Sequence, residues 1–172
     1  MEHFTTERLL ARDWRIDDAE AAFGIYGRME VMRWLGAEPR QAVPSVAAMR
    51  ERLEHMIERA GEHPDFGLWA IELREPQTLV GAVLLSPLPG EDGEVEIGWH
   101  LNPDHWGHGY ATESGRGVVE LAFGSRGLSR VLAVVDPDNE RSLAVCRRLG
   151  MAHLGQTDRY YGLTLELFEL AR

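Results

Sequence analysis

A glycine-containing turn in the middle of the chain constrains the fold more than any other feature. Residues 94–101 alternate acidic or small side chains with apolar ones, which predicts a strand with two different faces. The turn that follows, Trp106-Gly-His-Gly-Tyr-Ala-Thr-Glu113, leads into a segment with helical spacing. The first amides of a helix lack partners within the helix, and the helix dipole is positive there. The strand, turn and helix together predict a site for a phosphate or pyrophosphate group.

The two glycines have a physical role in such a turn. Gly107 and Gly109 can adopt positive φ angles, and they let the main chain approach an anion that a Cβ atom would obstruct. A G-x-G pair alone is equally consistent with a tight turn that binds nothing. Other parts of the sequence are therefore needed to distinguish an anion site from a turn that binds nothing.

Composition limits the class of protein. The 172 residues, 44% of them hydrophobic, suffice for one compact core, so we expect a single domain over residues 1–172. The chain has no apolar run of about 18 residues and no signal-peptide pattern, and we therefore expect a cytoplasmic protein without a membrane partner. Cys146 is the only cysteine, so no disulfide can form within the chain.

The charge is strongly negative, and lysine is absent. All 18 basic residues are arginine, and the 28 acids leave a formal net charge of −10. Such a charge disfavours non-specific binding to nucleic acid or to an anionic membrane and is compatible with a cationic substrate. Solubility alone also accounts for it.

The remaining periodic segments predict alternating helices and strands. Three strands precede a β-α-β crossover, so the sheet must be mixed and the fold is α/β or α+β. With residues 94–101, the predicted strands are 8–14, 66–73, 78–85, 130–135, 151–157 and 163–170, the second and third forming an antiparallel hairpin. The predicted helices are 19–26, 30–35, one from Pro44-Ser45 to Gly61, 111–123 and one around 143–149.

These elements and motifs resemble the GCN5-related N-acetyltransferase (GNAT) superfamily, in the RimJ/RimL-like branch of ribosomal-protein N-terminal acetyltransferases. The resemblance covers nearly the whole chain, and the order and spacing of its motifs make it specific. Besides the glycine turn, the motifs are Thr6-Glu-Arg-Leu9, Glu30-Val-Met-Arg-Trp-Leu-Gly36, Glu96-Ile-Gly-Trp99 and Asn139-Glu-Arg-Ser142, which runs on to Arg148-Leu-Gly-Met151.

This resemblance implies a GNAT-like, mostly antiparallel central sheet of about seven strands flanked by about four to five helices. It also implies an enzyme that moves an acetyl group from acetyl-coenzyme A (acetyl-CoA) to a primary amine, by direct transfer in a ternary complex and without a metal.

The resemblance further implies which residues bind the coenzyme. The backbone of Trp99, His100 and Leu101 would pair with the pantetheine arm, and their amides would polarise the thioester carbonyl, a contribution of roughly 3 kcal/mol. The family's phosphate loop, Q/R-x-x-G-x-G/A, matches at its last two positions, whereas Trp106 replaces its first polar residue. The loop residues are Trp106, Gly107, His108, Gly109, Tyr110, Ala111 and Thr112.

Asn139 and Ser142 match positions from which the family contacts the coenzyme. Asn139 could equally be only a helix N-cap, and Ser142 only a first-turn residue.

Few residues are candidates for the catalytic acid and base. Glu94 and Glu96 lie two residues apart on one face of the predicted strand, and either could accept a proton from the amine. We favour Glu96 as the catalytic base because it matches an acidic position in the resembled branch, although a solvated strand face is the alternative. Many family members place a tyrosine as the proton donor where this chain has Cys146. A thiol could donate as well, but Cys146 lies on an apolar helix face, which favours packing in the core. Ser142 and Tyr110 remain as acids, and the resemblance favours Ser142.

The free energy needed to deprotonate an amine ranks the possible acetyl acceptors. At pH 7 an α-amine with a pKa near 8 costs about 1.4 kcal/mol to deprotonate, whereas a lysine side chain costs about 4.6 kcal/mol. We therefore expect a peptide N-terminus or a small-molecule amine before an internal lysine. The aromatic candidates for the acceptor pocket, which could equally be core or interface residues, are Tyr26, Trp34, Phe66, Tyr160 and Tyr161.

Three rival hypotheses deserve comparison. A dinucleotide site is disfavoured because Thr112 stands where G-x-G-x-x-G needs its third glycine. A zinc site built from His100, His105 and His108 fits no familiar ligand spacing. A catalytically weak coenzyme-binding sensor or interaction domain of the same fold is the third, and the missing tyrosine favours it. The sequence is compatible with a homodimer but does not require one.

Overall fold

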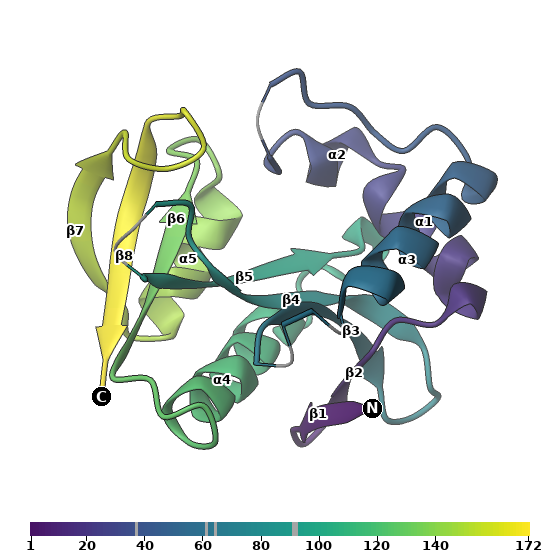
Figure 1. Cartoon of the computed structure of the whole chain (residues 1–172), viewed down its shortest axis with the longest axis horizontal. Coiled ribbons are helices and arrows are strands. Elements are labelled where there is room, and N and C mark those ends of the chain that lie inside the picture. The colour runs from purple at the N-terminus through teal and green to yellow at the C-terminus, as the bar shows by residue number, and fades with distance from the viewer. Residues whose placement is uncertain (37, 61, 64, 91–92) are drawn as a thin grey trace.

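The computed structural model describes residues 1–36, 38–60, 62–63, 65–90 and 93–172, so the helix end expected at Gly61 lies outside the described residues. Within these ranges the chain builds one open sheet of eight strands in the order β1-β2-β3-β4-β5-β6-β8-β7 (Figure 1). The strands are β1 Glu2–Thr5, β2 Leu9–Arg12, β3 Gly67–Leu73, β4 Leu79–Pro87, β5 Val95–Leu101, β6 Arg130–Val135, β7 Ala152–Thr157 and β8 Leu165–Ala171.

The first five strands form an antiparallel meander. Strands β3 and β4 pair as the predicted hairpin, with Trp69 opposite Val83. The structure adds β1, a short strand that folds back on β2 through a turn in which the backbone amide of Leu9 donates to Thr6 Oγ1 at 3.0 Å. The segment predicted as one strand over residues 8–14 is therefore shorter than expected.

The last three strands join the meander through a parallel contact. Strand β6 runs parallel to β5, and its other edge pairs antiparallel with β8 along all six of its residues. Strand β7 closes the far edge beside β8. The predicted mixed sheet is confirmed.

In the described part of the chain, five α-helices pack on the two faces of this sheet (Figure 1). The second predicted helix is shorter than expected and is limited to one turn. Ser45 begins the third, because its Oγ accepts the backbone N–H of Ala48 at 3.1 Å. The helices are α1 Ala19–Tyr26, α2 Met29–Met32, α3 Val46–Ala60, α4 Tyr110–Phe123 and α5 Glu140–Arg148, with 3-10 turns at Ile16–Asp18 and Pro103–His105.

The core has two main parts because neighbouring residues of a strand face opposite sides. Ala70 and Ala82 pack with the buried residues of α1 and α3. Ile71 and Val83 pack on the other side, with Val118 of α4 and the buried residues of α5.

Candidate active site

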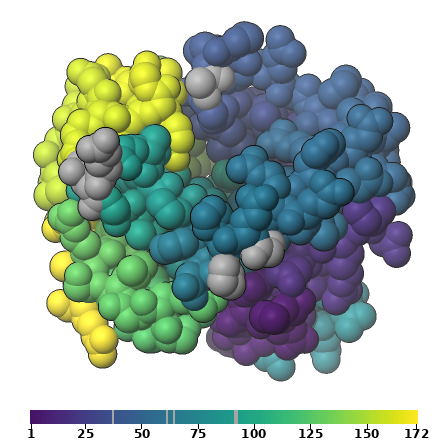
Figure 2. Space-filling view, in the orientation of Figure 1, coloured from purple at the N-terminus to yellow at the C-terminus, as the bar shows by residue number. Residues whose placement is uncertain are grey.

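Strands β5 and β6 are in contact at one end and separate at the other. Their register contains a single pair, Glu96 opposite Leu132, although β5 continues for five residues beyond Glu96. The opening leads into a cavity of about 930 Å³ whose lining comes from β5, β6, the start of α4, α5, the α2 region and the turn after β7. Figure 2 shows a recess between the blue segment that follows α2 and the yellow C-terminal strands.

Within the described residues, the edge of β5 that faces this opening has no partner strand beyond its pair with β6 at Glu96. The carbonyl of Glu94 accepts the amide of Leu88, and the amide of Asn102 donates to Val80, so the even-numbered residues of β5 bond to β4. The backbone groups of successive residues point to opposite edges, and those of Trp99 and Leu101 therefore point toward the opening. The Leu101 carbonyl accepts the indole N–H of Trp106 at 3.0 Å.

The glycine turn leads directly into α4. Gly107 and Gly109 have φ angles of 83° and 82°, so both use the left-handed conformation that glycine favours. No atom lies within 4 Å of a Cβ atom built on Gly107, and Gly109 has no side chain to cap the helix. The first amides of this 14-residue helix are thus open at the cavity wall.

Arginines surround the start of α4 in this acidic chain. Arg148 lines the main cavity, and Arg8 and Arg116 line a second depression beside it together with Gly109 and Thr112. The guanidinium of Arg8 donates to the carbonyl of His108 at 3.1 Å and lies over the ring of Tyr110. Open amides and guanidinium groups together suit an anion of several charges.

A buried carboxylate lies at the closed end of the opening. Glu96 is 7% exposed and lines the cavity, and its Oε1 accepts a hydrogen bond from the hydroxyl of Tyr161. Burial raises the pKa of Glu96 to about 7, and the bond from Tyr161 opposes that rise. Glu94 instead forms ion pairs with Arg130 at 2.9 Å and Arg159 at 3.0 Å.

Comparison with known proteins shows the family to which the chain belongs. The family model described as "Acetyltransferase (GNAT) domain" matches residues 8–152. The chain belongs to the GNAT family. It is an acetyl-CoA-dependent acyltransferase.

Relatives and solved structures agree with this assignment. The uncharacterized N-acetyltransferase YoaA of Bacillus subtilis strain 168 is 32% identical over 156 residues, covering 90% of this chain and 85% of YoaA. The GNAT-family acetyltransferase from Bacillus anthracis superposes with a TM-score of 0.81 at 22% identity, covering 99% of this chain and 98% of that one. The RimL ribosomal L7/L12 alpha-N-protein acetyltransferase, solved with coenzyme A, has a TM-score of 0.79 at 15% identity, covering 99% and 98%. The GNAT fold predicted from the sequence is confirmed.

The geometry of this GNAT domain fits acetyl-CoA. A CoA pyrophosphate needs open amides and positive charge, and the start of α4 offers both. The free edge of β5 suits an extended arm with amide groups, as an added strand would.

The structure places most of the predicted site residues around one cavity. Every predicted residue of β5, the glycine turn and α5 lines it except His108, whose ring stacks on Tyr110 with centroids 5.5 Å apart. Their roles stay predictions. The residues that line the cavity are Glu96, Trp99, His100, Leu101, Trp106, Gly107, Gly109, Tyr110, Ala111, Thr112, Asn139 and Ser142.

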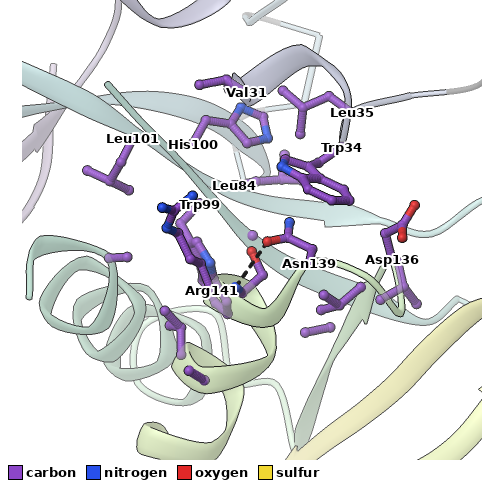
Figure 3. A pocket seen from close by; sticks show the side chains of 18 of the residues that line it. Val31, Trp34, Leu35, Leu84, Trp99, His100, Leu101, Asp136, Asn139 and Arg141 are labelled. Atoms are coloured by element: carbon purple, nitrogen blue, oxygen red, sulfur yellow. Dashed lines mark hydrogen bonds between the residues drawn. The ribbon is translucent and has the colours of Figure 1, made fainter. Parts of the chain in front are cut away.

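The start of α5 contributes a cap and a hydroxyl. Asn139 is the N-cap, and its Oδ1 accepts the amide of Ser142 at 3.3 Å (Figure 3). Cys146, one turn further along, is completely buried in the core, and burial raises its pKa to about 12. Cys146 is therefore a packing residue, as expected.

The aromatic candidates for the acceptor pocket separate into two groups. Trp34 and Tyr161 line the cavity. Tyr26 is completely buried, and its hydroxyl lies 3.1 Å from Nδ1 of His100. Phe66 packs against the α4 side of the core, and Tyr160 packs against Leu88 and Leu132. In Figure 3, Val31, Trp34 and Leu35 approach the cavity from the α2 side, opposite Asn139 and Arg141.

Sequence reasoning missed the arginines of this cavity. Arg52 projects from α3 and lines the cavity. Burial, with a further contribution from the charge of Arg52, lowers the pKa of His100 to about 4. Arg40 reaches Asp136, at the end of β6, at 3.3 Å. Arg52 follows the apolar position Met49 by three residues, so helical spacing places it near the buried face. No local pattern indicates the pairing of Arg40 with a residue 96 positions away.

The described residues include neither a cluster of metal ligands nor a membrane-spanning helix. No three His, Cys, Asp or Glu side chains in these ranges are grouped as metal ligands would be. None of the helices that can be described has the length and apolar character needed to cross a membrane.

Proposed function

We propose that this GNAT enzyme acetylates a primary α-amine, on a peptide N-terminus or a small molecule, by direct transfer from acetyl-CoA in a ternary complex with Glu96 as the base. The observation that carries the proposal is the position of Glu96. It is a buried carboxylate with a pKa of about 7, at the closed end of the opening between β5 and β6, and it lines the same cavity as the predicted cofactor-binding residues.

The pKa of Glu96 favours an α-amine. Proton transfer from an α-ammonium with a pKa near 8 to a group with a pKa of about 7 is uphill by about 1.4 kcal/mol. Transfer from a lysine ammonium near 10.4 is uphill by about 4.6 kcal/mol. The name of the RimL neighbour, an alpha-N-protein acetyltransferase, supports the same class of acceptor.

The cofactor-side residues have separate tasks in this proposal. Acetyl-CoA supplies a thioester whose acyl carbon the amine attacks. The edge of β5 at Trp99 and Leu101 orients the arm and places amides near the thioester carbonyl. Gly107, Gly109 and the first amides of α4 hold the pyrophosphate.

Two residues of α5 complete the assignment. Ser142, which lines the cavity at the start of the helix, donates a proton to the leaving sulfur. Direct transfer is supported by Cys146, because the single thiol of the chain is buried and its pKa is raised to about 12. A cysteine in that state is a poor candidate for a covalent acetyl intermediate.

The replacement Glu96→Gln tests the base. It keeps the shape and the acceptor atom for Tyr161 but cannot take a proton at neutral pH. We expect kcat/KM for the amine to fall by about 10²- to 10⁴-fold and its rise near pH 7 to disappear, while the Kd for acetyl-CoA stays unchanged. An unchanged profile of kcat/KM against pH would remove Glu96 from the mechanism.

A further inference from the structure

Two adjacent tyrosines in the turn between β7 and β8 bond to two carboxylates of the β5 segment. The hydroxyl of Tyr160 donates to Glu94, and the hydroxyl of Tyr161 donates to Oε1 of Glu96. Each tyrosine is about 65 residues from its partner, so neither pairing is a local consequence of sequence. The two contacts look alike, but their surroundings differ.

The hydrogen bond of Tyr160 has a structural role. Tyr160 is 2% exposed and packs with Leu88 and Leu132, and Glu94 is also held by its two arginine partners. Neither Tyr160 nor Glu94 lines the cavity. This cluster fixes the turn to the body of the protein.

The contact of Tyr161 faces the cavity. Tyr161 is 39% exposed and lines the cavity beside Leu163, whereas the carboxylate that it contacts is buried. Its φ angle is +58°, and Gly162 follows at +68°. A tyrosine pays roughly 1 kcal/mol for the left-handed conformation, so the surroundings must hold it there. The turn presents its side chain to Glu96 at that cost.

The second oxygen of Glu96 remains available. Oε2 accepts no hydrogen bond from a described residue. It is also not fully buried, so water in the cavity can reach it. A hydrogen bond on one carboxylate oxygen restricts the rotation of the whole group. Glu96 therefore presents Oε2 to the cavity in one orientation.

We propose that Tyr161 is a positioning residue for acetyl transfer, which holds Oε1 of Glu96 so that Oε2 meets the acceptor amine. This inference rests on the proposed function of Glu96 as the base. In the step concerned, a proton leaves the acceptor ammonium and binds to Oε2, and the neutral amine nitrogen bonds to the acetyl carbon. The carbon–sulfur bond breaks with its electron pair on sulfur, Ser142 gives that sulfur a proton and regains one from the new amide nitrogen, and coenzyme A leaves as the thiol. Tyr161 keeps its own proton throughout.

Electrostatics supports this role. Burial and then the carboxylate of Glu96 raise the pKa of Tyr161, so the hydroxyl stays protonated and remains a donor at neutral pH. Its bond lowers the pKa of Glu96 against the effect of burial. The flanking residues in the sheet, Ser86 on β4 and Leu132 on β6, are uncharged at neutral pH. The other charged or titratable groups that line the cavity are not among the causes of the pKa shift of Glu96, which are burial and the bond from Tyr161. They are His100 on β5 itself and, from other elements, Glu30, Arg40, Arg52, His105, Tyr110, Asp136, Glu140, Arg141 and Arg148.

The variant Tyr161→Phe removes only the hydroxyl, and Tyr160→Phe is its matched control. Without the donor the pKa of Glu96 rises, so the acidic limb of kcat/KM for the amine moves to higher pH. A rise from about 7 to about 8 lowers the ionised fraction at pH 7 about fivefold. The loss should therefore be largest at and below pH 7 and shrink toward pH 9, where only the part caused by the lost orientation of Glu96 remains. Tyr160→Phe should leave this limb in place and lower only the thermal stability.

Three results would overturn the role of Tyr161. One is a Tyr161→Phe profile that coincides with the wild type, and another is a loss of the same size at every pH, as a merely structural role would give. The third concerns the double variant: if Tyr161→Phe lowers kcat/KM as much in a Glu96→Gln background as in the wild type, it does not act through Glu96.

A measurement without turnover separates this inference from the proposed function. The carboxyl pKa of Glu96, read by ¹³C NMR and assigned with Glu96→Gln, should rise in Tyr161→Phe and stay constant in Tyr160→Phe. An unchanged pKa overturns the contact with Tyr161. A raised pKa in an enzyme that acetylates no amine supports the contact and contradicts the proposed function instead.

Discussion

At the scale of single residues, neighbours decide which of two similar carboxylates is suited to chemistry. Glu94 has arginine partners and lies outside the cavity, whereas Glu96 has one neutral donor and lines it. The sequence predicts both acids on one strand face and favours Glu96 through family resemblance. It cannot predict Tyr161 as the donor, because that contact depends on how a distant turn folds.

The raised pKa of Glu96 also affects stability. The folded protein binds the proton of Glu96 more tightly than the unfolded chain does, so between pH 4.5 and about pH 7 the unfolded state holds fewer protons on this group. The contribution of Glu96 to the free energy of unfolding therefore falls as pH rises through this window.

We expect Glu96→Gln to remove this loss. Relative to the variant, the wild type should lose up to about 3 kcal/mol of unfolding free energy between pH 4.5 and pH 8. Urea titrations of both proteins across that range measure the difference. A constant difference at all pH values would show that Glu96 titrates normally in the folded protein.

At the scale of elements, the strand, glycine turn and helix could be predicted because each has a local signal. Alternation predicts β5, two glycines predict positive φ angles, and helical spacing predicts α4. Short elements lack such signals. Strand β1 has only four residues and is defined by its pairing across a turn, and α2 is a single turn, so neither has a reliable period.

A glycine replacement tests the role of the turn. In Gly107→Ala the alanine must adopt a φ near 83°, at a cost of about 1–2 kcal/mol, and its methyl group enters the space beside the main chain. We expect acetyl-CoA to bind at least about tenfold more weakly, as measured by calorimetry.

The matched control for that variant is Gly127→Ala. Gly127 has a φ of 64° and equally open surroundings, but it lies between α4 and β6 and does not line the cavity. It should show similar backbone strain with an unchanged Kd. Equal losses of affinity in the two variants would mean that strain, and not contact with the coenzyme, weakens binding.

At the scale of the whole molecule, the site depends on the order and the pairing of the strands. The pattern of the sequence predicts a mixed sheet, but it does not predict that β8 lies between β6 and β7 or that β5 and β6 separate after one pair. Both features arise from pairings between distant segments. The cavity forms because of these two features.

A buried ion cluster ties the N-terminal layer together. Arg12, 3% exposed on β2, donates to Asp18 at 2.8 Å and to Glu72 on β3 at 2.6 Å. Replacing it with methionine leaves two carboxylates without their cation in a mostly buried place. We expect Arg12→Met to lower the free energy of unfolding by about 3–5 kcal/mol in urea titrations.

The surface pair of Arg28 and Asp104 provides the comparison for Arg12. Its atoms are 2.6 Å apart, but both side chains are at least one-third exposed. Arg28→Met should therefore cost less than about 1 kcal/mol. Similar losses in the two variants would contradict the structural role of the buried cluster.

The central claim, acetyl transfer to an α-amine, is tested most directly by the site of acetylation. Peptides that carry both a free N-terminus and an internal lysine are incubated with the enzyme and acetyl-CoA, together with small-molecule amines, and the products are located by mass spectrometry. We expect stoichiometric release of coenzyme A and acetylation at α-amines. Acetylation only at lysine ε-amines, or bound acetyl-CoA without transfer to any amine, would contradict the claim.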